Sequence, residues 1–189
     1  MKAIKFLSML AIAALTFNSC SNDDDAPDPV NEEEVITTVI VSLTPQGSGT
    51  AVTLTSRDLD GDGPNAPIVT VSGPLSVGTV YNGSIQFLNE LENPAEDITE
   101  EVAEEDDEHQ VFYSVTGGIG SITYTDSDGN GNPLGLAFTL STSASATTGV
   151  MTVILRHEPN KNAAGVSDGD ITNAGGETDI EVSFNVAVN

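Results

Sequence analysis

Residues 178–188 have the sequence TDIEVSFNVAV, and this stretch decides the fold class. Apolar residues occupy every second position of it: Ile180, Val182, Phe184, Val186 and Val188. The intervening positions hold Asp179, Glu181, Ser183, Asn185 and Ala187. Because successive side chains of a strand point to opposite faces, this period of two predicts a β-strand with one buried face and one wet face, on which Asp179 lies.

Shorter stretches of the same kind precede it, rich in Val, Ile, Thr, Ser and Gly and separated by turn residues, which is typical of strands. We expect strands at 35–43, 50–56, 68–72, 79–88, 108–115, 121–125, 136–141, 149–156 and 178–188. Many short antiparallel strands predict an all-β protein, an antiparallel β-sandwich, with an immunoglobulin-like arrangement or a small β-barrel as the alternatives.

Only the stretch near 97–106 differs from this pattern. Asp97 can cap a short helix in which Ile98 and Val102, four residues apart, share one face. The alternative is an irregular acidic loop.

The N-terminus has the layout of a secretory signal peptide over residues 1–19. Lys2 and Lys5 precede an apolar run from Phe6 to Phe17, which is too short to span a bilayer as a permanent helix. Asn18-Ser19-Cys20 follows at once and resembles the lipobox of bacterial lipoproteins, which implies lipidation of Cys20 and attachment to a membrane through that lipid. The alternative is an ordinary cleaved signal peptide followed by a stray thiol.

The segment after Cys20 is acidic. Ser21-Asn22-Asp23-Asp24-Asp25 resembles the lipoprotein export signal of one group of Gram-negative bacteria, which implies an outer-membrane lipoprotein on the cell surface; the periplasmic face is the alternative. Residues 20–34 then form the lipidated Cys and a disordered acidic tether, and residues 35–189 a single β-rich domain.

The charge balance excludes one class of partner. The whole chain has a formal net charge of −24, and removal of the signal peptide leaves Arg57, Arg156 and Lys161 against 29 acidic residues, a net charge of −26. Such a field repels nucleic acid and is compatible with divalent cations or basic partners.

Two loops have calcium-binding character. Asp58, Asp60 and Asp62 alternate before Gly63, and Asp126, Asp128 and Asn130 alternate before Gly131, so each loop presents oxygen ligands that could converge on one Ca²⁺ ion. Neither loop has the Glu at position 12 of an EF-hand. The alternative is that Asp, Asn and Gly serve only as turn residues.

The two histidines of the chain each have an acidic neighbour, in Glu108-His109 and His157-Glu158. If their strands are adjacent, His109 and His157 could form a carboxylate-assisted site for zinc, copper or iron. The alternative is that Arg156, His157 and Lys161 pair with the acids at 104–108 and brace the fold.

The loop 158–177 is long for a compact β domain, and such loops tend to be functional or mobile. Lys161, Asp168 and Asp170 are its candidate ligand contacts. The sequence contains no GxSxG, HExxH or phosphate-loop motif, so no enzyme is predicted.

Outside the N-terminus, the chain is similar to small surface lipoproteins of Gram-negative bacteria. The similarity rests on DITEE at 97–101, DEHQVFY at 107–113, LRHEP at 155–159 and GETDI at 176–180. Such proteins are often identified as members of the type 1 periplasmic binding fold superfamily, which implies two α/β lobes of roughly twice this length. The residue pattern, with no run of amphipathic helices, predicts the β-rich domain instead.

These features predict a cell-envelope lipoprotein that acts as a binding or accessory module for a ligand, metal ion or partner protein. The alternative is a structural acidic surface protein whose loops are stiffened by calcium.

Overall fold

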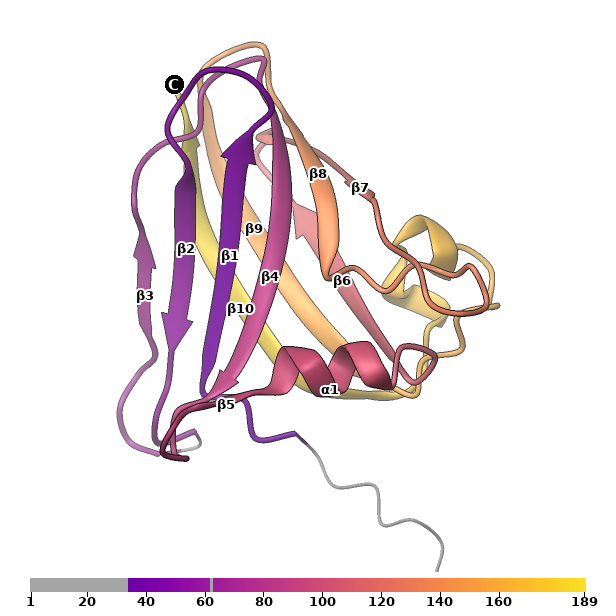
Figure 1. Cartoon of the computed structure of the whole chain (residues 1–189). Helices are drawn as coiled ribbons and strands as arrows, with labels where there is room; N and C mark the ends of the chain where they lie inside the picture. Colours follow the sequence, from indigo (N-terminus) through magenta and orange to yellow (C-terminus); the bar gives the residue numbers. More distant parts are fainter. Residues whose placement is uncertain (1–33, 62) are drawn as a thin grey trace, which may run out of the picture. The chain divides into compact units, whose positions relative to one another are not determined.

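The computed structural model describes residues 34–61 and 63–189, which fold as two antiparallel β-sheets (Figure 1). The larger sheet has the strand order β3-β2-β1-β4-β8-β7, with β5 paired to β4. Its strands are β1 (Thr38–Pro45), β2 (Val52–Arg57), β3 (Ile68–Val71), β4 (Val80–Asn89), β5 (Glu96–Asp97), β7 (Gly120–Tyr124) and β8 (Ala137–Thr142).

The smaller sheet has the order β10-β9-β6 and packs against the larger one. Its strands are β6 (His109–Val115), β9 (Thr147–His157) and β10 (Glu177–Val188). One core fills the space between the sheets, with fully buried side chains from both, such as Leu43, Phe87, Leu155 and Phe184. The sheets stay separate and do not close into one barrel, so the predicted sandwich is confirmed.

All nine predicted strands are present, displaced by at most three residues at their ends. Strand formation follows from alternation: in β1, Val39, Val41 and Leu43 are buried while Ser42 and Thr44 are exposed. The α/β lobes that the superfamily label implies are not found here, because the described residues contain a single α-helix of seven residues. No helix within 34–61 and 63–189 has the length and apolarity needed to cross a membrane.

The helix α1 (Ile98–Glu104) lies across one end of the sandwich (Figure 1). The Asp97 side chain caps it by accepting a 3.1 Å hydrogen bond from the backbone N–H of Thr99. Ile98 and Val102 are buried in the core, as their spacing predicts. The helix ends at Glu104 and β6 begins at His109, so α1 fixes where the first histidine enters the sheet.

A β-bulge interrupts the pairing of β10 with β9. Thr178 pairs with Arg156 and Ile180 with Leu155, so Asp179 is an extra residue without a partner on β9. A bulge of this kind re-aims the side chain at its position. The predicted wet position of Asp179 is therefore wrong, since its side chain is only 1% exposed.

The long loop between β9 and β10 is folded onto the sandwich. It contains the 3-10 helices η1 (Val166–Asp168) and η2 (Ile171–Asn173). Val166 and Ala174 are fully buried against Phe112, in a small second apolar cluster. The loop is therefore held by packing of its own.

Candidate metal centre

Four ionisable side chains converge at the end of the core near α1. Glu34 precedes β1, His109 begins β6, His157 ends β9, and Asp179 sits on the bulge of β10. One potential ligand atom from each residue lies within 4.8 Å of the others. The side chains of Glu34, His109, His157 and Asp179 are 5%, 0%, 6% and 1% exposed, so we call this set the buried cluster.

Strand register brings the two histidines together. β6 and β9 are neighbours, and His109 pairs directly with His157 across them, with ring centroids 4.6 Å apart. Both side chains share the inward face that carries Val111 and Leu155 farther along the same strands. The adjacency on which the predicted two-histidine site depends is therefore present.

The distances within the buried cluster are close to those of a metal site. His109 Nε2 lies 2.7 Å from Glu34 Oε1, His157 Nδ1 lies 3.6 Å from Glu34 Oε2, and His157 Nδ1 lies 3.9 Å from Asp179 Oδ1. Donor atoms bound at about 2.1 Å to one tetrahedral ion lie about 3.4 Å apart. The three separations differ from about 3.4 Å by roughly 0.2 to 0.7 Å, so side-chain shifts of that order would be needed to bring these atoms around one ion.

The ring of His109 is oriented by the end of α1. Its Nδ1 lies 3.2 Å from the carbonyl oxygen of Glu105, which accepts only, so Nδ1 carries the proton and donates. Nε2 therefore points into the buried cluster. Histidines that ligate metals are commonly held in this way, by a carbonyl or carboxylate on the other ring nitrogen.

The buried cluster contains polar atoms that no described group satisfies. Glu34 Oε2, His157 Nδ1 and both carboxylate oxygens of Asp179 are buried without a hydrogen-bond partner among the described residues. Such atoms usually find a partner, because leaving one unpaired costs about 1–3 kcal/mol, and more when it is charged. Four unpaired atoms gathered in this way are a set that could ligate a cation.

The histidine and carboxylate charges are strongly coupled. Burial alone would raise the pKa of Glu34, but the hydrogen bond from His109 and the charges of both histidines lower that pKa to about 2. Burial alone would lower the pKa of His109, yet the Glu34 carboxylate outweighs it and raises the pKa. Glu34 and His109 therefore form an ion pair in the absence of metal.

Asp179 has no such counter-charge. Burial, and secondarily the negative charge of Glu34, raises the pKa of Asp179 from its usual 3.8 to about 7. Near neutral pH this carboxyl therefore holds a proton for part of the time. A divalent cation would supply the positive charge that the ionised carboxylate lacks.

Sequence reasoning missed two members of the buried cluster, Glu34 and Asp179. Glu34 was assigned to the tether, yet its side chain is almost fully buried and contacts both histidines. Asp179 was assigned to the wet face because alternation cannot reveal a bulge. Neither contact has a local signal, since Glu34 is 75 residues from His109.

The first predicted calcium loop is exposed, and its described carboxylates bind the loop itself. Asp58 accepts from the backbone N–H groups of Asp60 and Gly61, and Asp60 accepts from Asn65. Asp62, the third predicted ligand, lies outside the described residues. These contacts are those of turn residues, and calcium binding here stays a prediction.

In the second predicted calcium loop, a lysine occupies the position facing the carboxylates. The Nζ of Lys161 lies 3.0 Å from Asp128 Oδ2, and both side chains are almost fully buried. Asp126 accepts from the backbone N–H groups of Gly135 and Ala137. Asn130 is exposed, and its backbone N–H donates to Asp128. Calcium would have to displace the Lys161 ammonium from Asp128. Calcium binding at this loop therefore also stays a prediction.

The predicted ligand contacts of the loop 158–177 do not converge. Lys161 is buried against Asp128, whereas Asp168 and Asp170 are exposed. Asp170 caps η2 by accepting from the backbone N–H of Thr172. Asp168 instead lines a hollow of about 400 Å³ that Asp126 also lines. Arg156 donates to the carbonyls of Gly175 and Gly176 rather than to the acids at 104–108.

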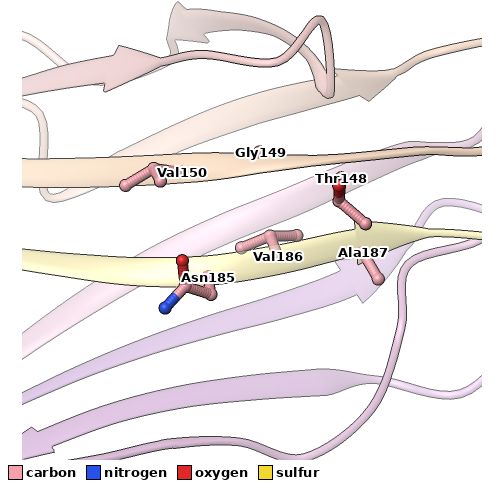
Figure 2. Close-up of a pocket in the computed structure, with 6 residues that line it drawn as sticks. All are labelled: Thr148, Gly149, Val150, Asn185, Val186 and Ala187. Atoms are coloured by element: carbon pink, nitrogen blue, oxygen red, sulfur yellow. The ribbon is translucent and has the colours of Figure 1, made fainter.

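Another hollow, of about 250 Å³, lies along β9 and β10 (Figure 2). It is lined by Thr148, Gly149, Val150, Asn185, Val186 and Ala187. This lining contains no ionisable side chain. Compared with the buried cluster, it therefore offers few groups that could bind a metal or transfer a proton.

Comparison with protein-family models, curated proteins and solved structures gives no match for this chain. The geometry of the buried cluster is therefore the basis for any statement about its chemistry.

Proposed function

We propose that this protein is a metal-binding module of the cell envelope that holds one divalent metal ion in the buried cluster. The favoured ion is Zn²⁺. The observation that carries the proposal is the convergence of two imidazoles and two carboxylates with four buried polar atoms left unpaired. A bound cation would take Glu34 Oε2, His157 Nδ1 and one oxygen of Asp179 as ligands.

The donor set favours zinc over calcium. Ca²⁺ takes six to eight oxygen ligands, whereas this cluster offers two ring nitrogens among its four donors. Zinc is commonly bound by histidine nitrogen and carboxylate oxygen in tetrahedral sites of four ligands. Imidazole also suits copper and iron, so these metals are the competitors to test beside zinc.

The number of protein ligands favours holding a metal over catalysis with it. Structural zinc sites are closed by four protein ligands, whereas catalytic sites keep one position open for water or substrate. Glu34, His109, His157 and Asp179 would fill all four positions, and they are nearly inaccessible to solvent. This agrees with the lack of a catalytic motif in the sequence.

The envelope location in this proposal rests on the N-terminal sequence. Cys20 and the acidic run after it lie outside the described residues, and they support attachment by lipid to the outer membrane with display at the surface or in the periplasm. The strongly acidic chain would concentrate cations around the module.

The direct test compares metal-free and zinc-treated full chain, purified in detergent, by metal analysis and thermal melting. At free zinc about a hundredfold above the Kd, binding to the folded state adds about 2.7 kcal/mol, which raises Tm by roughly 5–10 °C. The Asp179→Asn variant should lose most of this rise. The matched control Asp168→Asn changes an exposed aspartate and should keep it.

An unchanged Tm and no retained zinc in the wild type would overturn the proposal. A larger rise in Tm with copper, iron or manganese than with zinc would show that the site binds that metal in preference to zinc.

A further inference from the structure

His157 faces acidic groups on both sides of its ring. Its Nδ1 faces Glu34 and Asp179 in the buried cluster, at 3.6 and 3.9 Å. Its Nε2 lies 3.9 Å from Glu108 Oε2, which is too long for a hydrogen bond. The His157 side chain is 6% exposed, its Nδ1 is buried without a hydrogen-bond partner among the described residues, and its Nε2 faces the Glu108 carboxylate beyond hydrogen-bond distance.

The outer side of the ring has a second potential ligand set. Glu108, His157 and Glu158 each offer a donor atom within 4.8 Å of the other two. The backbone N–H of Glu158 donates a 2.6 Å hydrogen bond to the carbonyl of Glu108, which holds the two acidic residues side by side. Unlike the buried cluster, both glutamates are exposed to solvent.

From these contacts we infer a second cation subsite, formed by Glu108, Glu158 and Nε2 of His157, through which Zn²⁺ enters the buried cluster. This inference rests on the proposed function, since it deepens the description of the same centre. We call it the outer subsite.

The chemistry of the outer subsite suits a partly hydrated ion. It supplies three donors, so one or more positions remain for water, and its carboxylates keep their contact with solvent. An ion held here has shed part of its hydration shell and lies against the imidazole that separates it from the buried cluster. Two carboxylates at such an entrance also raise the local cation concentration and the rate of capture.

The alternative explanation is that Glu108 and Glu158 are ordinary solvated acids at a strand end. It differs from the inference in the zinc stoichiometry, because ordinary solvated acids at that position would not hold a second equivalent. The position of Nε2, on an almost fully buried side chain and 3.9 Å from the Glu108 carboxylate, favours the outer subsite.

The test is a calorimetric titration of the full chain, in detergent, with Zn²⁺ alone, together with the rate of zinc uptake from a chromophoric chelator. The wild type should bind a tight first equivalent and a second equivalent at least tenfold weaker, because the second ion has three donors facing solvent and must displace the Nε2 proton of His157, which passes to the buffer. The double variant Glu108→Gln/Glu158→Gln should lose the weak equivalent and load the tight one about tenfold more slowly, with its affinity nearly unchanged.

The matched control is Glu92→Gln/Glu100→Gln, which removes the same charge from exposed positions outside both ligand sets. It should retain both equivalents and the wild-type loading rate. Asp179→Asn should lose the tight equivalent and keep the weak one.

A wild type that binds one zinc, with stoichiometry and loading rate unaffected by Glu108→Gln/Glu158→Gln, would overturn the outer subsite and leave the proposed function standing. A wild type that binds no zinc at all would overturn both. Equal slowing in the Glu92→Gln/Glu100→Gln control would attribute the effect to overall charge and also overturn the subsite.

Discussion

At the scale of single residues, Asp179 sets the pH dependence of the metal-free protein. The pKa of Asp179 is about 7 in the folded state against a usual 3.8, so the folded chain binds this proton more tightly than the unfolded chain does. The free energy of unfolding must then fall as the pH rises from about 4 to about 7. The lowered pKa of Glu34, about 2, acts in a separate window, since its stabilising effect is lost as the pH falls from 4.5 towards 2.

Asp179→Asn should remove the first of these two effects. We expect the variant to be more stable than the metal-free wild type by on the order of 2 kcal/mol at pH 8, because no buried carboxylate has to ionise. At pH 4 the difference should be small. Urea unfolding in EDTA at pH 4, 6 and 8 measures both, and equal stability of the two proteins at all three values would contradict the burial of an unpaired carboxyl.

At the scale of elements, the sequence predicted the strands well and the geometry of the centre only in part. Alternation fixes which face of β6 and β9 is buried, and that was enough to suggest His109 and His157 as partners. The bulge at Asp179 depends on how β10 pairs with β9, and Glu34 meets the histidines only through the packing of both sheets. The residues that flank Asp179 and Glu34 in the sequence therefore predict neither the bulge nor the contact with the histidines.

The loop that carries Lys161 has buried contacts that the sequence does not reveal. The loop 158–177 was expected to offer Lys161 to a ligand, but its ammonium is buried against Asp128 and the carbonyl oxygen of Asp106. The lysine therefore ties this loop to the turn between β7 and β8. The functional role predicted from the length of the loop stays a prediction, and its buried contacts depend on the fold as a whole.

Lys161→Met should destabilise the protein by about 3 kcal/mol, because it leaves the Asp128 carboxylate buried without its counter-charge. The double variant Lys161→Met/Asp128→Asn should recover part of this loss, since the asparagine side-chain oxygen can still accept from the backbone N–H groups of Asn130 and Asn132. Urea unfolding of the wild type, Lys161→Met, Asp128→Asn and the double variant completes the cycle. Full additivity of the two substitutions would show that the pair is not coupled.

At the scale of the whole molecule, the buried cluster joins parts of the chain that are far apart in sequence. Glu34 leads into the first strand of the larger sheet, while the histidines and Asp179 come from all three strands of the smaller one. A metal bound there would cross-link the two sheets at the end covered by α1. Among the four proposed ligands, Glu34 is the nearest along the sequence to the predicted lipid anchor.

Anchor and metal centre should nonetheless be separable, because every proposed ligand lies at residue 34 or beyond, whereas attachment depends on Cys20. Cys20→Ala should move the protein from the membrane fraction to the soluble fraction, since the acyl chains that hold it there are lost. Its zinc affinity and its zinc-dependent rise in Tm should equal those of the wild type. Fractionation followed by metal titration measures both properties. Retention of the variant in the membrane would refute lipidation at Cys20, and a weakened zinc affinity would show that the segment before Glu34 takes part in the site.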